Sequence, residues 1–255
     1  MSYLINHNNN SFSNSFEISG SKSESNRLLI LNSIYGNLKI DNLSNSDDTV
    51  ILDKYITNLE SQIDVHHAGT AMRFLTALLA IKTNKQFVIT GSNRMKERPI
   101  KILVDALNKL GANISYYDKK GFPPLLIKGQ EIVGGEISLS SQISSQYISA
   151  LMLIAPILKN GLLINLEGKI TSKPYLEMTL AILKKIGINC YFKNNIISIQ
   201  PCSKINISSI SVESDWSSVS YFYSIVALSN AAELNIGTFY KSSIQGDFRL
   251  CEIYT

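Results

Sequence analysis

The sequence has few of the residues that build metal sites and disulfide frameworks. Its three cysteines, Cys190, Cys202 and Cys251, are scattered and form neither a zinc motif nor a set of disulfide pairs. Such cysteine usage is typical of a reducing compartment, so we expect a cytoplasmic protein. The adjacent His66 and His67 lack partners at metal-ligand spacing and are more typical of a polar loop. The sequence therefore predicts no metal and no cofactor, and it offers no Ser-His-Asp or Cys-His pair for nucleophilic catalysis.

Long hydrophobic runs and a strong net charge are missing as well. The longest apolar run, residues 150–158, includes a proline and is too short for a membrane-spanning helix. Residues 1–15 are rich in Asn and Ser and lack the basic-then-apolar layout of a signal peptide. The net charge of +4, from 24 Lys and Arg against 20 Asp and Glu, is too small and dispersed for a nucleic-acid surface. It suits a small anionic substrate.

Strand and helix patterns alternate along the whole chain. With 255 residues, of which 45% are hydrophobic, the chain can bury the core of one large domain or two small ones. Strand patterns cover 16–18, 37–40, 62–65, 86–90, 113–117, 125–128, 136–139, 162–166, 189–192, 196–200, 205–212 and 233–236. Helical periodicity covers 23–35, 47–59, 70–81, 100–110, 145–158, 175–186 and 217–229. The order predicts an α/β fold with mixed rather than purely parallel sheets.

An internal repeat is the strongest organisational feature. Segment 90–113 reads as Gly, polar loop, Pro, helix and Gly, and segment 167–189 repeats this layout about 75 residues later. The proline of each copy falls where a first helical turn tolerates it. A third copy starts at Ser217. Chance similarity between amphipathic units is the alternative, but the shared layout favours duplication.

Several predicted helices open with small hydroxyl residues or glycine beside a basic or amide residue. These openings are 19–23, 68–70, 144–146 and 171–174. A helix N-terminus offers unpaired N–H groups and a positive dipole end, and small residues let an anion approach. Ordinary N-capping explains any one opening equally well. Four openings within a duplicated domain favour an anion site in one cleft.

Basic residues strengthen this interpretation. Lys22 precedes a helix and Arg27 lies one turn inside it, so a point charge and a planar fork can face one phosphate or carboxylate. The loop 92–98 carries Arg94, Lys96 and Arg98 with a single anion, Glu97. The alternative for this loop is a solvated turn with an internal salt bridge to Glu97.

These motifs together resemble those of the 5-enolpyruvylshikimate-3-phosphate synthases, which are enolpyruvyl transferases. The matching motifs are Ser19-Gly-Ser-Lys-Ser-Glu-Ser-Asn-Arg27, His67-Ala-Gly-Thr-Ala-Met-Arg73, Arg94-Met-Lys-Glu-Arg-Pro-Ile100, Ser144-Ser-Gln-Tyr-Ile-Ser-Ala150, Ser172-Lys-Pro-Tyr175 and Asp215-Trp-Ser-Ser-Val-Ser-Tyr-Phe222. They occur in the family's order, but the match covers only about the first half of a typical member.

The resemblance implies a fold of two similar lobes, each made of three βαβαββ units around a pseudo-threefold axis. In that arrangement residues 1–19 are an N-terminal stub of the other lobe, 20–236 a complete shikimate-3-phosphate-binding lobe, and 237–255 the truncated start of the second lobe. The implied reaction transfers the enolpyruvyl group of phosphoenolpyruvate to the 5-hydroxyl of shikimate 3-phosphate and releases phosphate. This step serves chorismate and aromatic amino acid biosynthesis. The family also implies a monomer when full length, and inhibition by glyphosate-like molecules.

The resemblance also assigns roles to individual residues. Shikimate 3-phosphate is expected to be held by Ser23, Arg27, Ser144, Ser145, Ser172 and Tyr175. Phosphoenolpyruvate is expected to face Gly69, Arg94 and Gln146. Lys22 is expected to touch both substrates, and it is the candidate for proton transfer because a lysine crowded by cations loses its proton more readily.

Three departures from the family pattern accompany the match. His67 stands where Asn is common, Phe74 where Pro is common and Trp216 where a small residue is usual; His67 and Phe74 could change the fit around phosphoenolpyruvate and glyphosate-like inhibitors. The expected acid/base Asp and Glu, and further Arg and Lys ligands, would lie beyond Thr255, so we expect this chain alone to be inactive. The alternatives are a non-catalytic binding lobe and the related UDP-N-acetylglucosamine enolpyruvyl transferase, whose usual loop cysteine is missing from 92–98.

Overall fold

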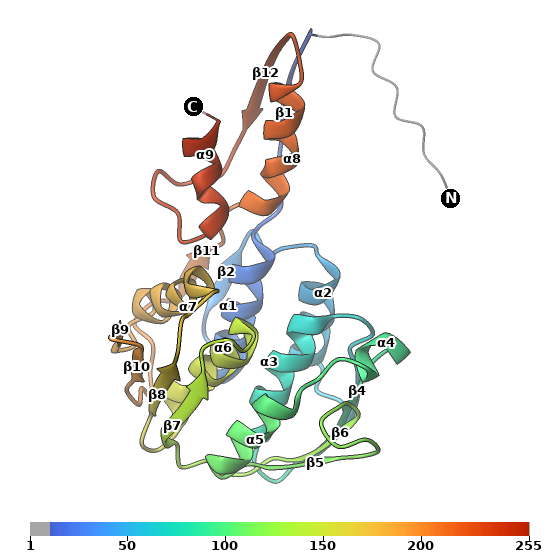
Figure 1. Ribbon diagram of the computed structural model, residues 1–255, viewed down its shortest axis with the longest axis vertical. Helices are drawn as coiled ribbons and strands as arrows, with labels where there is room; N and C mark the ends of the chain where they lie inside the picture. Colours follow the sequence, from blue (N-terminus) through green and yellow to red (C-terminus); the bar gives the residue numbers. More distant parts are fainter. Residues whose placement is uncertain (1–10, 255) are drawn as a thin grey trace.

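The computed structural model describes residues 11–254, which fold into two bodies joined by two passages of the chain (Figure 1). The larger body holds the elements from α1 to β11. The smaller body holds β1, α8, β12, η2 and α9. In chain order, the elements are β1 (Ser11–Phe16), α1 (Lys22–Tyr35), β2 (Lys39–Asp41), α2 (Asp47–Thr57), β3 (Gln62–Asp64), α3 (Gly69–Ala80), β4 (Gln86–Thr90), α4 (Asn93–Lys96), α5 (Lys101–Lys109), β5 (Asn113–Tyr116), β6 (Leu125–Lys128), β7 (Gly135–Ser140), α6 (Ser145–Ile154), η1 (Ala155–Ile157), β8 (Leu162–Glu167), α7 (Lys173–Lys185), β9 (Cys190–Lys193), β10 (Ile196–Ile199), β11 (Ser209–Ser211), α8 (Trp216–Ala227), β12 (Ala231–Ile236), η2 (Gly246–Arg249) and α9 (Leu250–Ile253).

Two successive stretches of the larger body have the same topology. The first runs β3-α3-β4-α5-β5-β6 and forms a sheet of order β3-β4-β6-β5. The second runs β7-α6-β8-α7-β9-β10 and forms a sheet of order β7-β8-β10-β9. In each sheet the first two strands are parallel and the others antiparallel, as the predicted mixed sheet requires.

A comparable set of elements is assembled from the two ends of the larger body. Strand β11 pairs in parallel with β2, although about 170 residues separate them. Helix α1 precedes β2 and α2 follows it, just as α3 and α5 flank β4. The helix that opens the predicted third copy, from Ser217, is α8. It packs on β12 in the smaller body and so lies apart from the other two copies.

Three helices supply the centre of the larger body. Every residue of α3 is buried, as are most residues of α6, because both helices are apolar around nearly their whole circumference. Helix α1 is buried from Glu24 to Leu31, and it contacts both of the others. This packing brings the first turns of all three helices to the same end of the body.

The remaining differences from the predicted elements are local. The N-terminal strand lies at Ser11–Phe16 rather than at 16–18, and the strand predicted at 205–212 is reduced to β11. The polar loop 92–98 contains the short helix α4, because Ser92 caps it and Met95 is buried beneath it. In the described part of the chain, no ion pair joins Glu97 to an arginine. No helix among residues 11–254 is both long and apolar enough to span a membrane.

The smaller body joins the larger through a tight crossover. Strand β1 pairs in parallel with β12, and these two strands form a sheet of their own, apart from the sheets of the larger body. Gly20 forms an antiparallel bridge with Ser214, and the Asp215 N–H donates to the Ser19 carbonyl over 3.1 Å. A Cβ on Gly20 would lie 1.8 Å from the Asn42 carbonyl oxygen, so this passage requires glycine.

Candidate functional site

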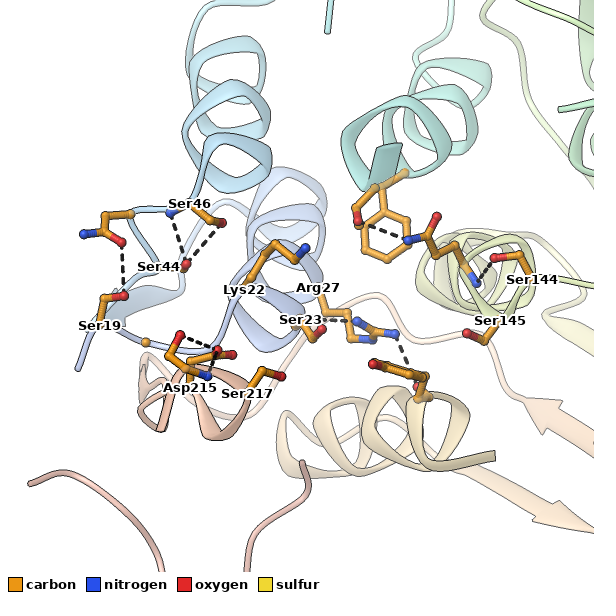
Figure 2. Close-up of a pocket in the computed structure, with 17 residues that line it drawn as sticks. Ser19, Lys22, Ser23, Arg27, Ser44, Ser46, Ser144, Ser145, Asp215 and Ser217 are labelled. Carbon is orange, nitrogen blue, oxygen red and sulfur yellow. Dashed lines mark hydrogen bonds between the residues drawn. The ribbon is translucent and has the colours of Figure 1, made fainter. Parts of the chain in front are cut away.

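The first turns of several helices surround a polar cavity of about 490 Å³, the main cavity (Figure 2). Helices α1, α3, α6 and α8 all begin at its wall, and the first turn of α7 reaches it through Tyr175. Seven of the ten residues predicted for the site line the cavity: Lys22, Ser23, Arg27, Ser144, Ser145, Gln146 and Tyr175. The helix openings noted in the sequence therefore do meet in one place.

The cavity also has lining residues that the sequence did not single out. The segment Ser44, Asn45 and Ser46, just before α2, supplies one wall. Its Ser-Asn-Ser-Asp pattern signals a helix start, but not which way the start faces. The opening of α8 supplies another wall through Asp215, Ser217 and Ser218, which belong to the sequence motif 215–222 but have no role predicted from the sequence.

The helix openings differ in whether their N–H groups already have partners. In α6 the Ser144 hydroxyl accepts from the Gln146 N–H over 3.3 Å, and in α8 Asp215 accepts from the Ser218 N–H over 2.9 Å. Helices α1 and α7 begin without a side-chain cap. The start of α1, with the exposed Lys22 and the half-buried Ser23, is therefore the opening best suited to an anion.

Lys22 and Arg27 give the cavity its positive charge, against one lining carboxylate, Asp215. Figure 2 shows both side chains between the segment from Ser44 to Ser46 and the start of α6. A ring of hydroxyl and amide groups around two cations is the environment of a polyhydroxylated anion.

Arg27 is buried, and it holds three helices together. Its Nε donates to Thr179 Oγ1 over 2.7 Å and its Nη2 to Ser149 Oγ over 3.0 Å, which links α1 to α7 and α6. Nη2 also donates to the Tyr175 carbonyl and Nη1 to the Ser23 carbonyl. Four of its five N–H groups are thereby used, which leaves at most one for a ligand. Burial lowers the pKa of Arg27 to about 10, well above neutral pH, so the group stays charged.

Phe74 packs beneath this arginine. The Arg27 guanidinium carbon lies 5.6 Å from the centre of the Phe74 ring, and the ring also lines the cavity. Phe74, one of the three residues that depart from the family pattern, therefore supports the positive charge of Arg27. Nearby, Gln146 Nε2 donates to Thr70 Oγ1 over 3.3 Å and ties α6 to α3.

Arg94 lies outside the main cavity, in a second one of about 510 Å³ lined with His67, Met95 and Arg98. Gly69, at the start of α3, lies against this second group: a Cβ there would come within 2.5 Å of Arg98 Nη1. Since Thr70 lines the main cavity, the start of α3 stands between the two. His67 Nε2 lies 3.2 Å from Asp47 Oδ2 at the exposed edge.

A further buried arginine lies beneath the second cavity. Arg73 Nη1 donates to the Gly69 carbonyl over 3.0 Å and contacts Met95 Sδ at 3.7 Å. Its guanidinium stands 5.8 Å from the centre of the Tyr147 ring, and burial lowers its pKa. The sequence motif includes Arg73, but its spacing does not show that the side chain braces α4 from below.

Ser172 lies apart from both cavities. It is the residue before α7 and makes no capping hydrogen bond with its side chain. The next residue, Lys173, forms an ion pair with Glu177, one helical turn later, over 2.9 Å. Of the predicted residues, Ser172, Gly69 and Arg94 are thus not among the lining residues of the main cavity.

Comparison with known proteins gives these two cavities a context. The family model for EPSP synthase (3-phosphoshikimate 1-carboxyvinyltransferase) matches residues 50–254. The chain belongs to the EPSP synthase family. It is 44% identical over 239 residues to the 3-phosphoshikimate 1-carboxyvinyltransferase of Bacteroides fragilis strain YCH46, covering 93% of this chain and 58% of that protein. The enzyme of the same name from Haemophilus influenzae strain PittEE is 38% identical over 262 residues, covering 89% of this chain and 60% of that protein.

The fold agrees with solved structures of the EPSP synthase family. The EPSP synthase from Acinetobacter baumannii superimposes with a TM-score of 0.77 at 20% identity, covering 91% of this chain and 57% of that one. The mixed α/β fold predicted from the sequence is thereby confirmed. The chain spans about 58% of the length of the curated relatives from Bacteroides.

Proposed function

We propose that the main cavity binds shikimate 3-phosphate as part of an enolpyruvyl transferase. The observation that carries this proposal is the convergence of helix openings on a cavity with two cations and many neutral hydroxyl and amide groups. The phosphate would be held at the uncapped start of α1 by Lys22 and Ser23. The ring hydroxyls would bond to Ser144, Ser145 and Gln146, and the apolar ring face would rest on Tyr175.

Phosphoenolpyruvate would occupy the second cavity and the start of α3. Arg94 and Arg98 provide two exposed guanidinium groups there, and Gly69 permits the close approach of Arg98. Lys22 would lie between the substrates. Arg27 would act mainly by orienting α1, because its bonds to α6 and α7 use most of its donors.

The proposed reaction adds the 5-hydroxyl oxygen of shikimate 3-phosphate to C2 of phosphoenolpyruvate; the hydroxyl group gives its proton to a base while C3 takes up a proton from an acid. The resulting tetrahedral ketal then loses a C3 proton as the bond from C2 to the phosphate oxygen breaks. Enolpyruvyl product and inorganic phosphate leave together. Lys22 is our candidate for proton transfer; a carboxylate pair and further cations would come from the part of the relatives that this chain does not span.

We also propose a finer description of the fold. The two stretches of equal topology, with the set made by α1, β2, α2 and β11, would be three βαβαββ-type units of one lobe, the third split between its two ends and lacking its final strands. The lobe would end near Ser214 rather than at residue 236, because β12 pairs with β1 and α8 packs on β12. The smaller body would be a portion of a second lobe.

Calorimetry and a phosphate assay on the 255-residue chain separate the two roles of this site. We expect heat of binding from shikimate 3-phosphate alone, and no release of phosphate when phosphoenolpyruvate is added. Release of phosphate would show that the chain is itself a complete catalyst. If shikimate 3-phosphate gives no heat while shikimate or inorganic phosphate does, the assigned ligand is wrong.

A further inference from the structure

Two carboxyl groups are buried together where the chain passes between the bodies. Glu24, in the first turn of α1, is 5% exposed, and Glu213, just after β11, is 1% exposed. Gln245, 6% exposed, comes from the segment before η2 in the smaller body. Its Nε2 donates to Glu24 Oε1 over 2.9 Å and contacts Glu213 Oε2 at 3.4 Å. One amide thus links two carboxyl groups of the larger body.

The cluster continues into the smaller body. Trp216 Nε1 donates to Glu213 Oε1 over 2.9 Å, and the Trp216 N–H donates to Gln245 Oε1 over 3.0 Å. The Tyr240 N–H donates to the same carboxylate over 3.0 Å, and the Ser243 hydroxyl donates to Glu213 Oε2. Glu213 therefore accepts from four donors of the smaller body, whereas Gln245 is the sole side chain among those described that donates a hydrogen bond to Glu24.

This cluster borders the cavity. The Ser21 N–H at the start of α1 donates to the Glu213 carbonyl over 2.8 Å, and Asp215 at the start of α8 follows two residues later. A smaller cavity of about 220 Å³ is lined by Gln245 and shares Ser23 and Asp215 with the main cavity. A shift of the cluster would therefore change the distance between the openings of α1 and α8.

We propose that Glu24, Glu213 and Gln245 form a latch that positions the openings of α1 and α8 around the bound anion. The latch is closed when the Gln245 amide bonds to both carboxyl groups, and this arrangement requires the two groups to hold one proton between them. This role deepens the proposed function and rests on it. Two ionised carboxylates in this dry site would repel each other, and this repulsion is larger than the gain from a charge-assisted hydrogen bond between Gln245 and Glu24. Glu24 and Gln245 would be positioning residues, since neither belongs to the lining of the main cavity.

The surroundings of Glu24 support the shared proton. Burial and the neighbouring Glu213 raise the pKa of Glu24 to about 7, against smaller lowering effects from Gln245, a Glu213 backbone contact and Lys185 of α7. Arg27, on the same helix, is the other charged group that interacts with it. Glu24 therefore changes charge close to neutral pH, where the latch would open.

Trp216 provides a direct readout because it is the chain's single tryptophan and a member of the cluster. We expect its emission in the ligand-free chain to change with one midpoint between about pH 6 and 8, and Glu24→Gln to abolish that transition. Glu60→Gln, at an exposed position, is the matched control and should keep it. A transition that survives unchanged in Glu24→Gln, or is absent from the parent chain, overturns the latch.

Binding of shikimate 3-phosphate tests the positioning role. Shikimate 3-phosphate itself changes charge with pH, and this affects the parent and Glu24→Gln equally, so the two dissociation constants are compared as a ratio at each pH. We expect the ratio of parent to variant to rise from near 1 at pH 5.5 to about 5 at pH 8.5. A ratio that does not vary with pH overturns the positioning role. If no variant binds at any pH, the proposed function fails, and the emission of Trp216 still decides on the latch. If Glu24→Gln does not fold, Gln245→Glu is tested instead. The Trp216 emission that the parent shows at low pH must be lost in this variant, or the latch is refuted.

Discussion

At the scale of single residues, we expect replacement of Lys22 to weaken ligand binding and replacement of Arg27 to lower the stability of the fold. Lys22 is exposed at the cavity wall, so its removal should leave the fold intact. We expect Lys22→Ala to weaken shikimate 3-phosphate binding about 10- to 100-fold, since a hydrogen bond to a charged group is worth about 1.5–3 kcal/mol. Calorimetry measures the affinity. Lys193→Ala, at an exposed position on β9, is the control; equal affinities in both variants would exclude Lys22 from the site.

Arg27 should behave in the opposite way. Replacement by Lys keeps one charge but cannot reproduce bonds to Thr179, Ser149 and two carbonyl groups. We expect Arg27→Lys to lower the free energy of unfolding by about 2–4 kcal/mol, because buried acceptors lose their partners. Urea denaturation followed by circular dichroism measures this. Arg249→Lys, in an exposed pair with Glu252, should leave the free energy of unfolding unchanged within error. Equal losses in the two variants would contradict the bracing role.

At the scale of elements, the crossover beside α1 depends on one glycine. A Cβ on Gly20 would lie 1.8 Å from the Asn42 carbonyl oxygen, and a backbone atom cannot simply rotate away. We expect Gly20→Ala to destabilise the chain by about 2–4 kcal/mol in thermal or urea unfolding. Gly237→Ala is the matched control, since a Cβ there meets nothing within 4 Å. Indistinguishable melting curves would mean that the two passages of the chain are not tightly packed.

Elements with a local signal were predictable, and those assembled from distant segments were not. Helices α5 and α7 were readable because a proline marks each start, an apolar stripe follows and a glycine ends each helix. Pro174 lies in the first turn of α7 as predicted, whereas Pro99 lies just before the N-cap of α5 and not in its first turn. The pairing of β11 with β2 has no local signal, because its partners are far apart in sequence and each strand is only three residues long. The apolar pattern of α8 likewise showed a helix but not which body it joins.

The same limit applied to the site. The openings of α1 and α6 carry Ser, Lys and Gln at spacings that signal an anion site, and both reach the main cavity. Asn45 and Ser46 were missed because their segment reads as an ordinary helix start. The bond from Gln245 to Glu24 spans 221 positions, so only the folded chain shows that two carboxyl groups share one amide.

At the scale of the whole molecule, the buried carboxyl pair makes stability depend on pH. The pKa of Glu24 is raised from 4.5 to about 7 on folding, so the folded state favours the neutral carboxyl. This contribution is fully present below pH 4.5 and is lost as pH rises through about 7. The cost in the alkaline range is up to about 3 kcal/mol, at about 1.4 kcal/mol per unit of pKa difference. Glu24→Gln removes that cost while keeping an oxygen that can accept from Gln245.

We therefore expect the parent chain and Glu24→Gln to have similar free energies of unfolding near pH 4.5 and to diverge above it. By pH 8.5 the variant should be more stable by about 2–3 kcal/mol, with the parent losing stability mainly between pH 5 and 8. Urea unfolding at a series of pH values measures both curves, and Glu60→Gln should follow the parent throughout. Parallel curves for the parent and Glu24→Gln would mean that Glu24 is ionised in the folded protein. The contact between the two bodies would then hold a buried negative charge on Glu24, which Gln245, Arg27 and Lys185 would have to balance.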